Sequence, residues 1–157
     1  MGKGKKISLI VLAALIIAQF FGPEKNEGDP TSMDAFYAET MPSNEVKQIL
    51  EVSCNDCHSN VTQYPWYNNI TPVNYWLAGH VNDGKKHFNI SNWVGNSTKR
   101  KDHKFEELIE MVEKKHMPLA SYTWAHSDAV LTDAQIKAVV DWAKQVRIKY
   151  ALEPQAE

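Results

Sequence analysis

The sequence is short of several features on which common protein classes depend. Only two of its 157 residues are cysteine, so no framework of several disulfides can hold the chain together. Lys and Arg number 17 against 19 Asp and Glu, which is not the basic surplus typical of a nucleic-acid binder. The alternation of polar and apolar residues that is typical of strands is nowhere sustained. These absences favour one compact and mostly α-helical domain.

Both cysteines lie in one pentapeptide, Cys54-Asn55-Asp56-Cys57-His58, which has the form C-x-x-C-H. This is the attachment signature of c-type haem. Two thiols at this spacing can each form a thioether bond with one vinyl group, and the imidazole of His58 can then bind the iron. The motif predicts one covalent haem c per chain, bound through Cys54, Cys57 and His58.

A second ligand, on the opposite face of the iron, separates an electron carrier from a protein that binds small ligands. Met117 is our candidate, because it precedes Pro118 in a loop far downstream of His58, with enough chain between to pass around the ring. A thioether sulfur opposite an imidazole favours ferrous iron and raises the reduction potential. His80, on the apolar face of a predicted helix, and His116, next to Met117, are alternative ligands.

Two further groups of side chains are candidates for contact with a haem or a partner. The basic residues near 85–87 and 99–104 can neutralise haem propionates or form a docking rim for an acidic partner, although a solvated surface is the simpler interpretation. The aromatic candidates for the walls of a haem site are Trp66, Tyr67, Trp76, Tyr122 and Trp124.

The predicted function is single-electron transfer between redox partner proteins, without bond chemistry, so we expect no enzyme. A haem-based sensor or small-ligand-binding protein, with five-coordinate iron or a labile sixth position, is the alternative. A peroxidase is disfavoured because Arg100 and Arg147 are the only arginines and no distal His–Arg pair is evident. A haem-free thiol–disulfide protein would need a βαβ pattern, and a zinc site would need a closely spaced histidine pair, neither of which this sequence has.

The N-terminus predicts the compartment. Lys3, Lys5 and Lys6 form a positive head before an apolar stretch at residues 7–21, typical of a signal peptide or a short membrane anchor. We expect an anchored domain on the periplasmic side of a bacterial inner membrane, or a secreted periplasmic domain if the leader is cleaved. The predicted divisions are a signal-anchor or signal peptide at 1–22, a linker at 23–42, the haem-binding domain at 43–150 and a tail at 151–157.

Apolar periodicity and capping residues predict four helices in the domain. Ser43 is a plausible N-cap for the first, which ends near residue 52. The others are expected from Pro72 to about residue 84, over about 104–115, and after Thr132, which forms a capping box with Gln135. The stretch 85–102 is predicted to be a loop.

Two segments resemble a known family. They are CNDCHSNVTQYPWYNNITPVNYWLAGHVNDGKKHFNISNW at 54–93 and HMPLASYTWAHSDAVLTDAQIKAVVDWA at 116–143. Together they are similar to the haem-binding domain family of small, membrane-tethered c-type cytochromes. The resemblance implies a small cytochrome c-like helical domain, with long loops around one covalently bound haem and an apolar N-terminal helix before it. The second segment also resembles class I cytochromes c, in which the methionine matching Met117 is the sixth ligand.

Overall fold

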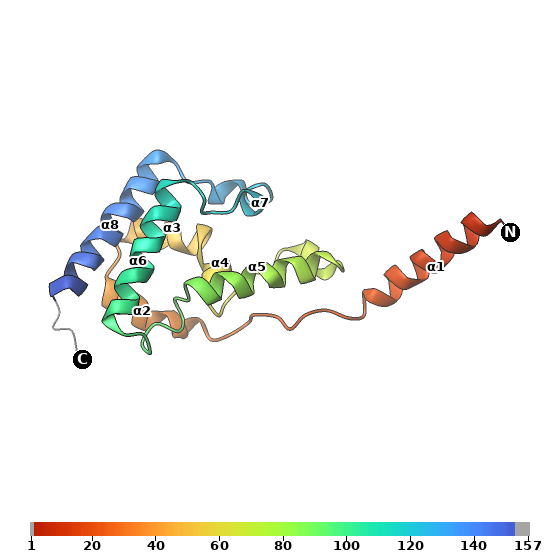
Figure 1. Cartoon of the computed structure of the whole chain (residues 1–157), viewed down its shortest axis with the longest axis horizontal. Helices are drawn as coiled ribbons and strands as arrows, with labels where there is room; N and C mark the ends of the chain where they lie inside the picture. The colour runs from red at the N-terminus through yellow and green to blue at the C-terminus, as the bar shows by residue number, and fades with distance from the viewer. Residues whose placement is uncertain (1, 153–157) are drawn as a thin grey trace.

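The computed structural model describes residues 2–152, which fold into helices joined by loops (Figure 1). Within these residues no strand forms, and one isolated antiparallel bridge pairs Glu27 with Val61. The prediction of a mostly α-helical chain is confirmed. The α-helices are α1 Lys3–Ala18, α2 Asp34–Thr40, α3 Asn44–Ser53, α4 Asn55–His58, α5 Val73–His87, α6 Thr98–Glu113, α7 Ala120–Thr123 and α8 Asp133–Leu152, and the short 3-10 turns are Pro30–Met33, Trp66–Asn69 and Ser127–Ala129.

The core is a cluster of aromatic rings between α2, α6 and α8. Figure 1 shows α6 and α8 side by side, and α3 also packs against α8. Phe105 of α6 lies fully buried at the centre, with ring centroids 6.2 Å from Phe36, 5.6 Å from Trp93 and 5.3 Å from Trp142. Such edge-to-face and offset contacts add to the free energy gained by burying the rings. This cluster is the rigid frame to which the motif at 54–58 is attached.

The predicted caps of two helices are present. The Ser43 hydroxyl accepts a hydrogen bond from the backbone N–H of Val46 at 3.2 Å, and α3 follows it directly. At the start of α8, Thr132 accepts from the Gln135 N–H at 3.2 Å, and the Gln135 side chain accepts from the Thr132 N–H at 2.9 Å. This reciprocal pair satisfies two N–H groups that the helix leaves free.

The middle helices differ from the prediction at their ends. Pro72 precedes α5 rather than forming its first residue, and the helix continues past Gly84 to His87. Helix α6 begins at Thr98, because the Ser97 hydroxyl caps it by accepting from the Arg100 N–H at 3.3 Å. The loop expected over 85–102 is therefore reduced to the stretch between these two helices.

The expected linker at 23–42 is not a free tether. Asn26 donates hydrogen bonds to the Ser59 carbonyl and the Thr62 hydroxyl, both at 2.9 Å, and so binds the loop that follows the C-x-x-C-H motif. Further along, α2 buries Phe36 completely in the aromatic core. The linker was predicted from the Pro, Gly and charged residues in the first half of this segment. These residues give no indication that Phe36, in the second half, is fully buried.

The apolar N-terminal stretch forms α1, which lies beyond the start of α5 and away from the aromatic core (Figure 1). Its apolar side chains are exposed. Across residues 2–152, no helix has both the length and the apolar character that crossing a membrane requires. The expected tail at 151–157 has only its first two residues in the structure, within α8, and residues 153–157 lie outside the described residues, as does Met1.

Replacement of Phe36 by alanine tests whether α2 belongs to the folded domain. We expect the free energy of unfolding to fall by about 3–5 kcal/mol, because a fully buried ring leaves a cavity in the core. Urea unfolding followed by circular dichroism measures the change. The matched control is Phe20→Ala, since Phe20 is 83% exposed and its loss should cost less than about 0.5 kcal/mol. Equal effects of the two substitutions would contradict the placement of α2 in the core.

Candidate functional site

The C-x-x-C-H motif forms one helical turn at the end of α3. Cys54 terminates α3, and α4 follows at once with Asn55–His58. The backbone N–H groups of Cys57 and His58 both donate to the carbonyl oxygen of Cys54, at 3.2 and 3.0 Å. Residues three apart in such a turn lie on the same side of it, so the turn presents both thiols to the same region.

The thiols of Cys54 and Cys57 form no disulfide, and both have a raised pKa that keeps them protonated at neutral pH. Burial raises the pKa of Cys54 to about 12, with a further contribution from Cys57, and it raises the pKa of Cys57 to about 11. Thiols that exchange disulfides at neutral pH have a lowered pKa, because the thiolate is the reacting form. The environment of Cys54 and Cys57 therefore disfavours a thiol–disulfide protein.

The imidazole of His58 is oriented by a backbone carbonyl. Its Nδ1 lies 2.9 Å from the Phe88 carbonyl oxygen at the end of α5, and a carbonyl can only accept, so Nδ1 carries the proton. Burial lowers the pKa of His58 below its usual value, which keeps the ring neutral at neutral pH. In the neutral ring, Nε2 then has a free lone pair. Metal-binding histidines typically donate their other ring N–H to a carbonyl or carboxylate in this way.

Gly84 allows α5 to pack directly on the motif. A Cβ at this position would lie 2.4 Å from the carbonyl oxygen and 3.0 Å from the Cβ of Cys57. No side chain fits there without moving the backbone of Cys57, which has little freedom within the turn. This close approach places the end of α5, including Phe88, where it can accept the hydrogen bond from His58. The sequence indicated Gly84 only as the expected end of a helix.

A mostly apolar cleft opens beside the motif, between α5 and the segment around α7. Its empty volume is about 520 Å³ when the open solvent at its mouth is included. Cys57 lines it, whereas Cys54 and His58 do not. Of the five aromatic candidates, Tyr67, Trp76 and Tyr122 line the cleft, while Trp66 and Trp124 do not and are 76% and 90% exposed.

One polar atom in this cleft lacks a partner. The Nε2 atom of His80 is buried and makes no hydrogen bond within the described residues, although a buried polar group normally finds a partner. The ring of Trp76, one turn earlier on α5, holds the imidazole edge-on with centroids 4.4 Å apart. His80 also lies one turn before Gly84, the point where α5 touches Cys57. His80 therefore lies beside the motif, on the helix that packs against it.

The wall opposite α5 is tied to the motif by a tyrosine. The hydroxyl of Tyr122, in α7, donates to Asp56 Oδ2 at 2.8 Å, and its ring stacks on His126 with centroids 4.2 Å apart. Burial and the bonded Asp56 carboxylate raise the pKa of Tyr122 well above its usual range, so the phenol remains a donor. Asp56 is the second variable residue of C-x-x-C-H, and the motif alone did not indicate that its side chain has this role.

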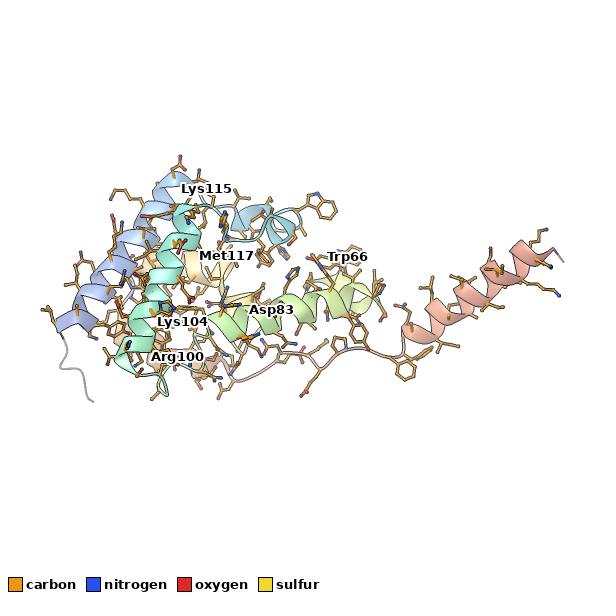
Figure 2. The ribbon with its side chains drawn as sticks, in the orientation of Figure 1. Trp66, Asp83, Arg100, Lys104, Lys115 and Met117 are labelled. Carbon is orange, nitrogen blue, oxygen red and sulfur yellow. The ribbon has the colours of Figure 1, made fainter. Side chains whose placement is uncertain are left out.

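Met117 lies in the connection between α6 and α7 (Figure 2). The side chain is half-buried, and the backbone N–H donates to the Met111 carbonyl at 3.1 Å. Met117 does not line the cleft, but Leu119, two residues later, does. The neighbouring His116 is exposed. The structure thus places His80 in the cleft and Met117 on the segment that leads into its opposite wall.

These side chains fit a haem. Two thiols and a neutral imidazole lie in one turn, an apolar cleft adjoins that turn, and His80, which lines the cleft, has a buried Nε2 without a partner. No group of three or more His, Cys, Asp or Glu side chains within residues 2–152 is arranged to hold a metal ion directly.

Comparison with known proteins gives one match. The family model described as a haem-binding domain matches residues 13–145, well over half of the chain. No curated protein and no solved structure matches the chain. The matched region contains the motif, both walls of the cleft and the segment 23–42 that the sequence had indicated as a linker.

Replacement of Gly84 by alanine tests the close packing of α5 on the motif. The new methyl group would overlap the Cys57 carbonyl, so we expect a loss of about 1–3 kcal/mol in the free energy of unfolding and a lower yield of haem-loaded protein. Gly79→Ala is the matched control on the same helix, because nothing lies within 4 Å of its Cβ position. This control should be neutral or stabilising by up to about 1 kcal/mol. Thermal unfolding measures the loss of stability, and the ratio of haem to protein absorbance measures the yield. Equal results for Gly84→Ala and Gly79→Ala would contradict the close packing of α5 on the motif.

Proposed function

Because the chain belongs to the haem-binding domain family, we propose that it is a monohaem c-type cytochrome that carries single electrons. The observation that carries the proposal is the environment of His58. Its Nδ1–H donates a hydrogen bond to the Phe88 carbonyl, so its Nε2 has a free lone pair. Two thiols lie in the same turn. Covalent attachment through Cys54 and Cys57 would keep the cofactor in place without full enclosure by the domain.

The residues of the site have distinct roles in this proposal. Cys54 and Cys57 would form the thioether bonds to the haem, and His58 would bind its iron through Nε2. The bound haem supplies a couple that accepts and releases one electron. The apolar lining of the cleft excludes water, which favours the iron state of lower charge and so raises the reduction potential. Tyr122 holds the segment around α7 against Asp56 and limits movement of the opposite wall.

For the sixth ligand we propose Met117. It lies on the segment that leads into the wall opposite α5, and a thioether would give the high potential expected of an electron carrier. His80 is the competing ligand, supported by its unpartnered Nε2 in the cleft. Either residue would leave the iron six-coordinate, as electron transfer favours. A sensor or small-ligand binder would instead leave the sixth position open or labile.

We also propose that the domain works on the exported side of a bacterial membrane, where it meets redox partner proteins. Support comes from the basic head at Lys3, Lys5 and Lys6 and from the exposed apolar surface of α1 that follows it. An exposed apolar helix of this kind is typical of a segment that meets lipid or is removed during export.

Covalent attachment is tested by extraction with acidified organic solvent. We expect the pigment of the wild-type protein, matured in a cytochrome-competent host, to stay with the polypeptide. Cys54→Ala and Cys57→Ala should each lose one of the two thioether links, which shifts the pyridine haemochrome band because one vinyl group remains conjugated. Ser53→Ala, beside the motif, is the control and should leave that band in place. Release of the wild-type pigment into the solvent would refute a haem c.

The sixth ligand is tested by the spectra of two variants. In Met117→Ala we expect loss of the far-red charge-transfer band between thioether and ferric iron, together with a lower reduction potential, because a soft sulfur ligand stabilises ferrous iron. His80→Ala should retain that band. If His80 is the ligand instead, the wild-type protein lacks that band, and His80→Ala rather than Met117→Ala changes the spectrum and the potential. Rapid carbon monoxide binding by the reduced wild-type protein at neutral pH would instead favour a sensor or ligand binder.

A further inference from the structure

A second depression lies on the side of the domain where α5 ends and α6 begins. Its empty volume, open solvent included, is about 450 Å³, and its lining is polar, with three asparagines. Four cationic side chains also line it, namely Lys85, Lys86, Arg100 and Lys104. Among the described residues that line this basic depression there is no carboxylate. Figure 2 shows Arg100 and Lys104 on the first half of α6, close to the end of α5.

Part of this positive charge is not neutralised by the protein. Lys104 binds Glu107 at 2.7 Å, and Lys85 donates to the amide oxygen of Asn26 at 2.5 Å, which leaves its charge uncompensated. Lys86 and Arg100 are exposed, and their side chains make no hydrogen bond or ion pair within residues 2–152. The N-terminus of α6 adds the partial positive charge of a helix dipole to the same place.

The basic depression backs directly onto the ring of His58. Phe88 lines it, and the Phe88 carbonyl accepts the hydrogen bond from His58 Nδ1. The two rings also touch, with centroids 5.9 Å apart. One residue therefore separates the imidazole from the surface of the depression, so a molecule bound there would lie close to the iron on the His58 side.

We propose that the basic depression is the docking surface for the carboxylate-rich face of a redox partner protein. The inference rests on the proposed function, since it places electron exchange behind His58 rather than at the cleft. Charges of one sign spread over two helix ends attract an extended acidic surface and orient it during encounter. In the exchange one electron passes between the iron and the partner, no bond forms or breaks, and no proton moves.

Two substitutions on one helix provide a matched test. Arg100→Glu reverses a charge in the basic depression, and Lys114→Glu reverses one at the far end of α6, next to Lys115 in Figure 2. Both side chains are exposed, and both variants change the net charge equally. Arg100→Glu should fold well, because a glutamate three residues after the Ser97 cap completes a capping box. The Lys114→Glu substitution removes an exposed ion pair with Glu110, and such a pair contributes little to stability.

The first measurement is the oxidation of the ferrous protein by small one-electron reagents of opposite charge. Hexacyanoferrate(III) is the anionic probe and tris(bipyridine)cobalt(III) the cationic one, and each takes one electron from the iron. At about 10 mM salt we expect Arg100→Glu to slow the anionic reagent by about three- to tenfold and to speed the cationic one. Lys114→Glu should change either rate by less than about twofold. Equal effects of the two variants would show that only net charge matters and would overturn the proposal.

The second measurement does not need the cofactor. Calorimetry with an oligoglutamate of about ten residues should show binding to the full chain that Arg100→Glu weakens several-fold and Lys114→Glu does not. Inorganic phosphate at the same concentration of charge should bind far more weakly. Phosphate binding as tight as that of the peptide would indicate a small-anion site, and absent peptide binding would refute the docking surface. A colourless protein that still binds the peptide would refute the haem c proposal alone.

Discussion

The structure depends on one close contact, the packing of α5 against the turn that contains Cys54, Cys57 and His58. Gly84 brings the backbone of α5 against the Cys57 carbonyl, where a Cβ would lie only 2.4 Å away. Because the helices meet this closely, the Phe88 carbonyl at the end of α5 comes within 2.9 Å of His58 Nδ1. The same helix then presents His80 to the cleft, one turn earlier. The contact between Gly84 and Cys57 thus determines which nitrogen of His58 carries the proton, and it shapes the neighbouring cleft.

The aromatic core gives this contact a rigid support. Phe105 contacts the rings of both Phe36 and Trp142, so α2, α6 and α8 are locked into one unit. The indole N–H of Trp142 also donates to the Thr40 carbonyl at 2.9 Å, which satisfies a buried donor and closes the end of α2. Since α3 packs on α8 and leads directly into the motif, the core fixes the position of the thiols. The thiols and the imidazole of His58 are therefore held on a rigid support.

The chain also separates two environments around the site. On one side is an apolar cleft, whose polar contacts are few and include the Tyr122–Asp56 hydrogen bond. On the other side, behind His58, is a basic and polar depression that contains Arg100 and Lys86. The apolar side suits a flat ring that must be shielded from water, and the basic side suits recognition of an acidic surface in water. Cys57 lines the cleft, and the next residue, His58, contacts Phe88 of the depression.

The amino-acid sequence by itself determined what depends on neighbouring residues: the C-x-x-C-H turn, the Ser43 cap of α3, and the capping box of Thr132 and Gln135. These interactions span only a few residues, so their patterns are visible in a linear sequence. Only the tertiary structure decided that Phe36 belongs to the core rather than to a linker, that Gly84 faces Cys57, and that Lys86 and Arg100 line the same depression. The physical reason is that these contacts join segments far apart in the chain, and local composition carries no information about which distant surfaces will meet.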